Sequence, residues 1–347
     1  MTVRAIVVDD SPSMQALISA VLNTDPEIEV VGTAENPDEA RQMIKTLNPD
    51  VITLDIEMPG MNGLDFLERL MRLRPMPVVM ISSWTRKGAD ATIAALELGA
   101  FSCLPKPRMD DEAALREMCE NVKAAAAAKH AISQRNNAAP VAKQSGKQVS
   151  TRLDIVAIGA STGGVEALTE VLSGFPADCP PTVITQHMPE HFTKSFSERL
   201  NRLCAPTVVE AEDMMPLQRG HVYLAPGAIG HLTVSDRTEA RCRIRRTEPV
   251  SGHMPSVDVM FESVAQVYAR RSAAALLTGM GSDGANGMLA LKDAGAHTIA
   301  QDRATSLVYG MPAAAARLGA ANRVLPLSEI AAVLLAGPTE ERQSVCA

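Results

Sequence analysis

The chain has 347 residues, more than twice the roughly 150 that one compact domain usually contains, so two domains are expected. Hydrophobic residues make up 46% of the sequence and charged residues 21%, a composition that excludes an intrinsically disordered protein. The formal net charge of −7 and the pI near 5.6 argue against nucleic acid or an anionic membrane as the main partner, because both demand a concentrated basic surface.

The cysteines and the N-terminus point to a reducing compartment. Six cysteines occur without any C-x-x-C pair, which favours neither a zinc knuckle nor a disulfide framework. The apolar run at the N-terminus is too short for a secretory signal and is followed at once by two carboxylates. No stretch approaches the ~20 apolar residues of a membrane helix. We therefore expect a cytoplasmic protein without direct membrane insertion.

Short β-branched runs alternate with amphipathic segments in the first third of the chain. This βα rhythm, repeated five times, predicts an α/β domain with a parallel, doubly wound, five-stranded sheet. In such sheets ligands bind at the carboxyl ends of the strands. The expected strands are residues 3–8, 29–33, 51–55, 78–82 and 101–104, and the expected helices lie near 13–23, 37–46, 62–73, 88–98 and 110–128.

A polar segment separates this domain from a second one. Residues 123–150 are rich in Ala, Gln, Asn, Ser and Lys and are expected to form a helix tail and a linker. The apolar rhythm restarts at Asp154 and predicts a second doubly wound, mostly parallel α/β domain. A β-hairpin is expected within it, formed by residues 231–235 and 240–248. The predicted organisation is therefore a domain at 1–122, a linker at 123–150 and a domain at 151–347.

Three carboxylates, a hydroxyl and an amine are expected at one edge of the first sheet. Asp9 and Asp10 follow the first strand, and the third, fourth and fifth strands end at Asp55, Ser82 and Lys106. The carboxylates repel one another unless a cation lies among them, and such an oxygen cage suits Mg²⁺. The expected chemistry is an acyl phosphate on Asp55 with Lys106 as counter-ion. The alternative is that each Asp merely caps a helix.

This half of the chain resembles the response-regulator receiver family over about residues 1–122. The resemblance rests on VVDDS at 7–11, DIEMPGMNG at 55–63, the serine after PVVMI and PKP at 105–107. It implies a flavodoxin-like receiver in which Asp10, Asp55 and the backbone carbonyl of Glu57 bind Mg²⁺ while Asp9 acts through water. It also implies that the Lys106–Pro107 peptide bond can be cis.

One position departs from the receiver pattern. Cys103 stands in the fifth strand where the family has an aromatic residue whose rotamer reports phosphorylation. The resemblance implies a sensor histidine kinase as the phosphodonor, whereas the route by which activation is transmitted stays open.

A serine follows the first strand of the second domain. Ser161 lies among small residues in Gly159-Ala160-Ser161-Thr162-Gly163-Gly164, directly before a helical pattern. A serine at such a strand-to-helix turn is exposed, and the helix N-terminus favours negative charge developing beside it. The alternative is a phosphate-binding loop for a nucleotide, but the sequence matches neither G-x-G-x-x-G nor the P-loop pattern.

An activated serine needs a base, and His187 is the best-placed histidine. It follows the strand that ends near Thr185 and should lie at the same sheet edge as Ser161, whereas His130 lies in the linker and His297 precedes its strand. A surface or hydrogen-bonded core imidazole remains the alternative reading of His187. The histidines that remain possible ligand-pocket residues are His221, His231 and His253.

His187 also begins an H-x-x-E-H sequence that ends at His191, the pattern of an inverted zinc protease. That pattern requires both imidazoles on one helical face. Pro189 at its centre and the strand leading into it argue against such a helix, so zinc chemistry is not expected.

A carboxylate and an amide are expected beside the imidazole. Asp283 lies in a glycine-rich turn after the apolar run 274–280, where it would hold the tautomer of His187. Its alternative role is that of an ordinary turn former. The surrounding glycines leave the backbone free to point N–H groups at an oxyanion, with the amide of Met280 as the expected donor.

Residues 151–337 resemble the chemotaxis protein-glutamate methylesterase family. The motifs are GASTGG, QHMP at 186–189, YLAPG at 223–227, PSVD at 255–258, LLTGMGSDGANG at 276–287, and TIAQD with VYGMP within 298–312. The resemblance implies Ser161, Thr162, His187, Met280 and Asp283 as active-site positions. It implies a hydrolase that demethylates glutamate methyl esters and deamidates glutamines on chemoreceptors without an esterase cofactor.

The expected regulation is release of an autoinhibited enzyme, in which the receiver covers the esterase crevice until Asp55 is phosphorylated. Two other classes of function stay open. One is a phosphorylation-dependent docking module whose esterase-like half is inactive, and the other is a nucleotide-binding regulator.

Overall fold

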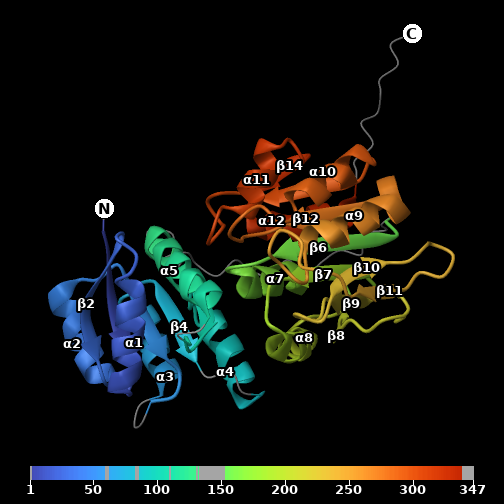
Figure 1. Ribbon diagram of the computed structural model, residues 1–347. Coiled ribbons are helices and arrows are strands. Elements are labelled where there is room, and N and C mark those ends of the chain that lie inside the picture. Colours follow the sequence, from blue (N-terminus) through green and yellow to red (C-terminus); the bar gives the residue numbers. More distant parts are fainter. Residues whose placement is uncertain are drawn as a thin grey trace. The chain divides into compact units, whose positions relative to one another are not determined.

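The chain folds into two compact units, Met1–Pro140 and Val141–Ala347, each built around its own parallel sheet (Figure 1). The computed structural model describes residues 2–58, 62–82, 86–108, 111–129, 132 and 153–337. Within these residues no helix combines the length and the apolar character needed to cross a membrane.

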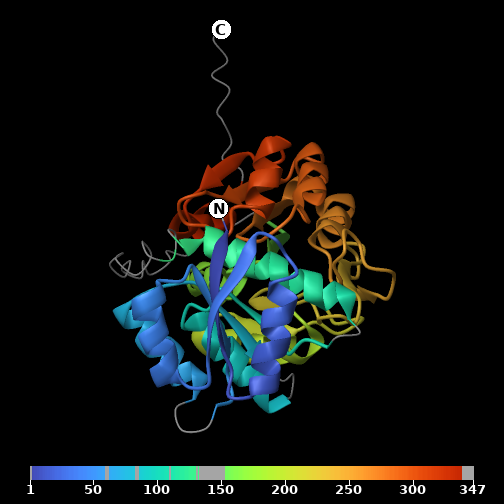
Figure 2. The same ribbon diagram turned by 60° about the vertical axis from the view of Figure 1, so that its left-hand side comes forward.

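The N-terminal unit is a five-stranded parallel sheet in the order β2-β1-β3-β4-β5. Helices α1 and α5 contact each other over one face of this sheet, and α3 contacts α4 (Figure 2). Its elements are β1 (Val3–Val8), α1 (Pro12–Leu22), β2 (Ile28–Ala34), α2 (Pro37–Leu47), β3 (Val51–Asp55), α3 (Gly63–Leu73), β4 (Val78–Ser82), α4 (Arg86–Glu97), β5 (Ser102–Pro105) and α5 (Glu112–Ala127).

Local sequence explains why these elements begin where they do. Asn36 caps α2 because its side chain accepts the backbone N–H of Glu39 at 3.0 Å, and Pro37 supplies a helical φ without needing a hydrogen-bond partner for its nitrogen. The strand β3 is buried along its whole length, as expected of a central strand covered on both faces. The carboxyl ends of β1, β3, β4 and β5 therefore lie along one sheet edge.

The C-terminal unit contains a seven-stranded sheet in the order β14-β13-β12-β6-β7-β9-β8, in which every pairing is parallel. A separate antiparallel hairpin pairs β10 with β11. The elements are β6 (Ile155–Ala160), α7 (Gly164–Ser173), β7 (Thr182–Gln186), α8 (Glu190–Leu203), β8 (Thr207–Glu210), β9 (His221–Leu224), β10 (His231–Val234), β11 (Cys242–Arg245), α9 (Val257–Tyr268), η1 (Ala269–Arg271), β12 (Ser272–Leu276), α10 (Ala285–Asp293), β13 (His297–Gln301), α11 (Met311–Arg317), β14 (Arg323–Leu325) and α12 (Leu327–Ala336).

Helices form two groups around this second sheet. Helix α10 contacts both α9 and α11, and α7 contacts both α8 and α12. Phe261 of α9 is fully buried in a cluster with residues of β6 and β12, among them Ile155 and Leu276. Strands β6, β7 and β12 are buried along their whole length and are neighbours in the sheet. Side chains that follow these three strands are therefore held on a rigid, water-excluded base.

The sequence-based expectations for the fold class, the N-terminal strands and the hairpin are confirmed. All five expected strands of the N-terminal unit are present with ends shifted by no more than one residue, and the expected hairpin forms at 231–234 and 242–245. The expected domain limits at 122 and 150 stay a prediction, since α5 continues to Ala127 and residues 133–152 lie outside the described residues. The expectation of a cis Lys106–Pro107 bond is wrong: the cis bond in the described residues joins Met254 to Pro255.

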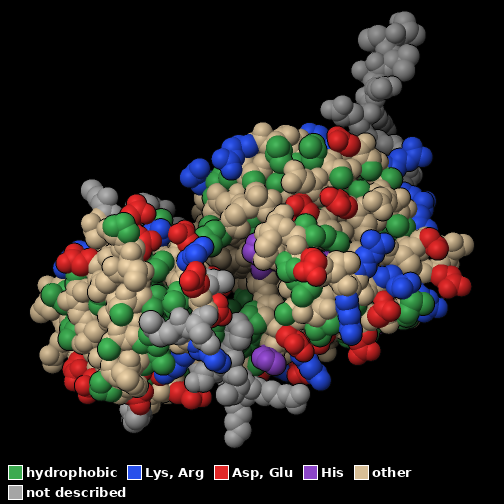
Figure 3. All heavy atoms as spheres, viewed as in Figure 1, with side chains coloured by type: hydrophobic (Ala, Val, Ile, Leu, Met, Phe, Trp, Pro, Cys, Tyr) green, Lys and Arg blue, Asp and Glu red, His purple; other side chains and the backbone are tan. Residues whose placement is uncertain are grey.

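Charged side chains of both signs are interspersed on the molecular face shown in Figure 3. Lys and Arg lie among Asp and Glu, and several Lys and Arg side chains lie close together on the right of the C-terminal unit.

Candidate active site

Ser161 lies at the carboxyl end of β6, in the turn that leads into α7. Its backbone N–H donates to the carbonyl of Thr278 at 3.0 Å, and its own carbonyl accepts the N–H of Gly164 at 2.7 Å. The turn requires the left-handed φ of 79° at Gly163, a conformation that glycine adopts without strain. The result is a partly exposed hydroxyl at the N-terminus of a helix, as the sequence predicted.

A close approach of two backbones shapes the surroundings of this serine. A Cβ atom at Gly279 would lie 2.7 Å from the Cβ of Ser161 and would also collide with the sulfur of Met311. Glycine at 279 therefore lets the segment after β12 pass directly beside Ser161, which brings the neighbouring amide of Met280 to the same region.

His187 and Asp283 form a buried pair beside this turn. The backbone N–H of His187 donates to the carbonyl of Ala160, so His187 lies next to Ser161 across two adjacent strands. The Nε2 atom of His187 lies 2.8 Å from Oδ2 of Asp283. Its Nδ1 atom is buried and has no hydrogen-bond partner among the described residues. This leaves Nδ1 as the nitrogen free to accept a proton.

Asp283 is held at the N-terminus of α9. Its carboxylate accepts the hydroxyl of Ser256 at 2.8 Å and the backbone N–H groups of Val257 and Asp258 at 2.7 and 3.1 Å. Burial alone would raise the pKa of Asp283, but the bond to His187 and the backbone donors outweigh it and lower the pKa to about 2. The group is therefore a carboxylate near neutral pH, with its negative charge against the imidazole.

A second buried carboxylate links α9 to α10. Asp258, in the first turn of α9, accepts the backbone N–H of Gly287 in the first turn of α10 at 2.7 Å. Asp283, just before α10, in turn accepts N–H groups at the start of α9. Each helix N-terminus therefore has a carboxylate beside it. Burial raises the pKa of Asp258 to about 6, and the nearby Asp283 and Glu262 carboxylates add to the effect, although the N–H of Gly287 opposes it. This role of Asp258 was not predicted, because the residue occurs in the sequence only as the last position of the PSVD motif.

Two backbone amides in this region remain available as donors. The N–H groups of Thr162 and Met280 make no hydrogen bond to any residue that the structure describes. Thr162 follows Ser161 at the start of the turn into α7, and Met280 follows the close approach at Gly279. The Met280 side chain is 37% exposed and borders the site. An oxygen bound next to Ser161 could receive both N–H groups.

Gln186 also takes part in the site, although its role was not assigned from the sequence. Its side-chain amide donates to the carbonyls of Ser161 and His187 at 2.9 and 3.0 Å. It thus ties the two turns together. In the sequence Gln186 occurs only as the first residue of the QHMP motif. No sequence pattern distinguishes a glutamine that bonds to two turns from an ordinary buried amide.

The histidines that sequence analysis left open have separate positions. His253 stacks on His187 with ring centroids 3.8 Å apart and an interplanar angle of 12°. His231 accepts the backbone N–H of Ser256, and His221 begins β9.

The zinc-protease pattern is excluded, because α8 begins only at Glu190 and leaves His187 outside the helix that contains His191.

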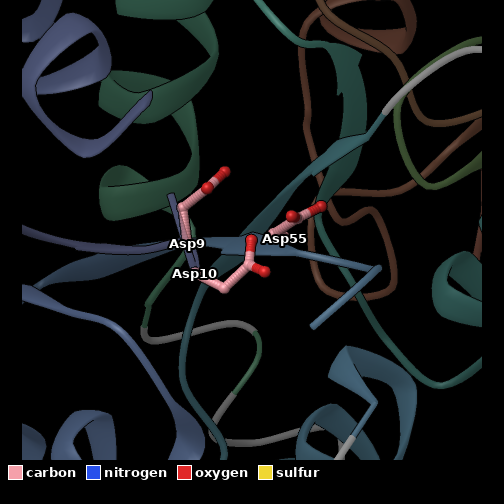
Figure 4. A group of neighbouring side chains, drawn as sticks. All are labelled: Asp9, Asp10 and Asp55. Atoms are coloured by element: carbon pink, nitrogen blue, oxygen red, sulfur yellow. The ribbon is translucent and has the colours of Figure 1, made fainter. Parts of the chain in front are cut away.

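The acidic cluster of the N-terminal unit forms as predicted. Asp9, Asp10 and Asp55 offer carboxylate oxygens that all lie within 4.8 Å of one another (Figure 4). The Nζ atom of Lys106 lies 2.8 Å from Oδ2 of Asp55 and 3.0 Å from Oδ2 of Asp9. Ser82 ends β4, and its carbonyl accepts the backbone N–H of Lys106. The five side chains thus occupy one sheet edge.

The charges of this cluster fit a divalent cation. Burial raises the pKa of Asp55 and the neighbouring Asp9 adds to the rise, although Lys106 opposes it. The Oδ2 atom of Asp9 is buried, and its contact with Lys106 lacks hydrogen-bond geometry, which leaves lone pairs for a ligand. One lysine does not neutralise three carboxylates, so the donor set and its excess charge suit Mg²⁺. Glu57, whose carbonyl is a further expected ligand, lies next to the cluster, since its backbone N–H donates to Oδ1 of Asp55 at an N···O distance of 3.3 Å.

Comparison with known proteins identifies both units. A family model described as CheB methylesterase matches residues 156–334, and one described as response regulator receiver domain matches residues 5–136. The chain belongs to the CheB methylesterase family. The resemblances seen in the sequence are thereby confirmed.

Members of this family with assigned names are similar over almost the whole chain. A protein-glutamate methylesterase/protein-glutamine glutaminase from Agrobacterium fabrum is 55% identical over 344 residues, 98% of either chain. A protein of that name, numbered 1, from Caulobacter vibrioides is 53% identical and covers 96% of this chain and 97% of its own. The crystal structure of the Thermotoga maritima CheB methylesterase catalytic domain matches with TM-score 0.51 and 36% identity, over 53% of this chain and 97% of that domain.

The raised pKa of Asp258 predicts a pH-dependent stability. Between about pH 4 and 6 the folded protein keeps a proton on Asp258 that the unfolded chain has lost, so this group destabilises the fold as the pH rises. Asp258→Asn should remove this dependence of the free energy of unfolding on pH. Between pH 4 and pH 7, the free energy of unfolding measured with urea is expected to fall by roughly 2–3 kcal/mol more in wild type than in the variant. The exposed control Asp178→Asn should keep the wild-type slope, and equal slopes for Asp258→Asn and wild type would contradict the prediction.

Proposed function

We propose that this chain is a phosphorylation-activated hydrolase that removes methyl groups from glutamate methyl esters on chemoreceptors and deamidates glutamine side chains there. The observation that carries the proposal is the His187–Asp283 pair, which leaves one imidazole nitrogen free beside Ser161. The names of the relatives, methylesterase and glutaminase, supply the substrate class.

The proposed reaction begins at Ser161. Its hydroxyl oxygen attacks the side-chain carbonyl of the methylated glutamate, while its proton moves to Nδ1 of His187. Asp283 keeps its charge, as its low pKa requires, and stabilises the imidazolium through Nε2. The tetrahedral intermediate collapses when the imidazolium protonates the departing methanol.

The remaining steps use the same groups in reverse. Water, deprotonated by His187, attacks the acyl enzyme and releases the glutamate carboxylate and Ser161. With a glutamine side chain the leaving group is ammonia instead of methanol. The amides of Thr162 and Met280 are proposed to hold the oxyanion in both reactions. One such donor is typically worth about 2.7–4 kcal/mol of transition-state stabilisation.

Two other functions are less well supported. A docking module with an inactive esterase half would not require an imidazole bonded to a buried carboxylate. Asp283 is such a carboxylate, and it accepts His187, the Ser256 hydroxyl and two backbone N–H groups. A nucleotide-binding regulator would need a phosphate loop at Ser161, where neither phosphate-binding pattern occurs. We further propose that the protein acts in the cytoplasm, with a sensor histidine kinase and chemoreceptors as partners and without nucleic acid.

Replacement of the proposed nucleophile provides the direct test. Ser161→Ala should lower methanol release from a methylated chemoreceptor by roughly 10³-fold or more, because no other group supplies the attacking oxygen. Gas chromatography of the released methanol gives the rate. Ser173→Ala, at the exposed end of α7, is the matched control and should retain wild-type activity. Undiminished release by Ser161→Ala would refute the hydrolase mechanism.

The N-terminal unit is proposed to regulate this activity through Asp55. Asp10, Asp55 and the carbonyl of Glu57 would hold Mg²⁺, with Asp9 acting through water, and the ion would neutralise charge during phosphoryl transfer. Lys106, whose Nζ lies 2.8 Å from Oδ2 of Asp55, is proposed to pair with the phosphoryl group after transfer, and Ser82 at the end of β4 is proposed to contact it. The receiver is proposed as residues 1–122, the linker as 123–150 and the catalytic domain as 151–347.

Phosphorylation is expected to raise methanol release by about tenfold or more, which corresponds to ~1.4 kcal/mol in an equilibrium between inactive and active forms. The experiment adds a small acyl-phosphate donor and Mg²⁺ to the full chain. Asp55→Asn, or removal of Mg²⁺ with a chelator, should abolish the activation. The control Asp65→Asn, on the exposed side of α3, should still be activated. Activation of Asp55→Asn to the wild-type level would exclude Asp55 as the acceptor.

The proposed autoinhibition makes a separate prediction. Removal of residues 1–140 should raise basal methanol release, because the crevice would no longer be covered. The comparison measures kcat/KM of the truncated and full-length proteins without a phosphodonor. The relative from Thermotoga maritima was crystallised as a catalytic domain, which supports an independent fold for the truncated protein. A truncated enzyme no faster than the full chain would contradict autoinhibition.

A further inference from the structure

An imidazole that the proposed reaction does not use lies flat against the ring of His187. His253 stacks on it at 3.8 Å between centroids and at 12° between planes, which is close to parallel. The His253 ring makes no hydrogen bond to any described residue, and Asp283 is bonded to His187 instead. The contact is therefore one of ring faces, without proton exchange between the two imidazoles.

The backbone holds His253 firmly in this position. Val250 and His253 exchange two N–H···O bonds of 3.0 and 2.9 Å across a tight turn. The two residues within the turn, Ser251 and Gly252, have φ values of 53° and 79°, the left-handed pair that such a turn requires. The next residue, Met254, accepts the backbone N–H of Ala228. The backbone that carries the ring of His253 is thus held by hydrogen bonds of the fold itself.

The hydrogen bond to Asp283 restrains the ring of His187 but leaves it some freedom to tilt. Because Nε2 lies off the Cβ–Cγ axis, a full turn of the ring would break the contact with Asp283, whereas the bond tolerates a swing of about 30°. Such a swing would shift Nδ1 relative to Ser161. The ring of His253, with its centroid 3.8 Å away, limits the swing because the edge of the tilting imidazole would move into it.

We propose that His253 is a positioning residue for hydrolysis: its ring limits the tilt of His187 so that Nδ1 can take the proton of Ser161, and it covers one face of the imidazolium. This inference rests on the proposed function, and it adds a residue to which sequence analysis gave no role in the reaction. Since the ring acts through its face, a benzene ring should replace it and a non-aromatic side chain should not.

The charge state of His253 is compatible with this role. Burial lowers the pKa of His253 to about 4 and the charge on His187 adds to the effect, although Asp283 opposes it. His187 and Asp283 are the titratable groups that act on it within the described residues. Near neutral pH His253 is therefore uncharged, and it does not repel the imidazolium that forms on His187 during the reaction.

The test compares His253→Phe, His253→Gln and His253→Ala in the full chain, with methanol release measured from pH 5 to 9. We expect the Gln and Ala variants to lower kcat by roughly 10- to 100-fold with KM within about twofold, since a ring displaced by about 1 Å costs up to that much. The Phe variant should stay within about threefold of wild type.

The split between kcat and KM distinguishes positioning from a merely structural role. In the Ala and Gln variants the loss should appear in kcat at every pH from 5 to 9, because the ring of His187 is displaced while the substrate still binds. In the Phe variant kcat should stay within about threefold of wild type over the same range. The control His297→Ala removes a half-buried imidazole at the opposite end of the sheet and should leave kcat within about twofold.

Each remaining outcome counts against the inference. If Phe is as impaired as Ala, the ring nitrogens of His253 are needed and positioning by the ring face is wrong. If all three variants match wild type in kcat and in pH profile, His253 has no role in the reaction. Should Ala fail to fold, the Phe and Gln pair still decides. Full activity of Ser161→Ala, assayed in parallel, would instead refute the proposed function itself.

Discussion

The buried negative charge of Asp283 is the constraint on which the C-terminal unit depends. A lone carboxylate at this depth would cost several kcal/mol, and it is tolerated because a hydroxyl, two backbone N–H groups and an imidazole all donate to it. The same charge selects the tautomer of His187, since Nε2 must carry the proton that Asp283 accepts. The N-terminus of α9, which holds Asp283, therefore determines that Nδ1 is the unprotonated nitrogen.

The sheet topology explains how three distant segments supply one site. Strand β6 is central, and the chain leaves it towards β7 on one side and later returns to β12 on the other. Ser161, His187 and Asp283 follow these three adjacent strands, so the parallel sheet alone brings them to one edge. Because β6, β7 and β12 are buried throughout, this edge is rigid, and hydrogen bonds between side chains that follow different strands require such fixed positions.

The parts predicted from sequence are those that local patterns determine. Apolar runs such as Val51–Asp55 gave strands correctly, and strand ends gave the positions of Asp55, Ser161 and His187. Asp258 and Gln186 were not assigned roles, and His253 was kept only as a possible pocket residue, because each acts through contacts between elements that are remote in sequence. The geometry of the Lys106–Pro107 bond was misjudged for a related reason, since the isomer depends on the folded surroundings.

The free amides of Thr162 and Met280 belong to the main chain, and this affects how the family can vary. Replacing either side chain by any residue other than proline leaves the N–H group in place, so such substitutions at positions 162 and 280 would alter the surroundings of Ser161 and keep the proposed oxyanion donors. The vulnerable position is Gly279, which contributes no functional group of its own. A methyl group there would separate the two backbone segments. In the proposed mechanism the polarising groups of the site are thus main-chain atoms, and their placement depends on a glycine and not on the side chains at 162 and 280.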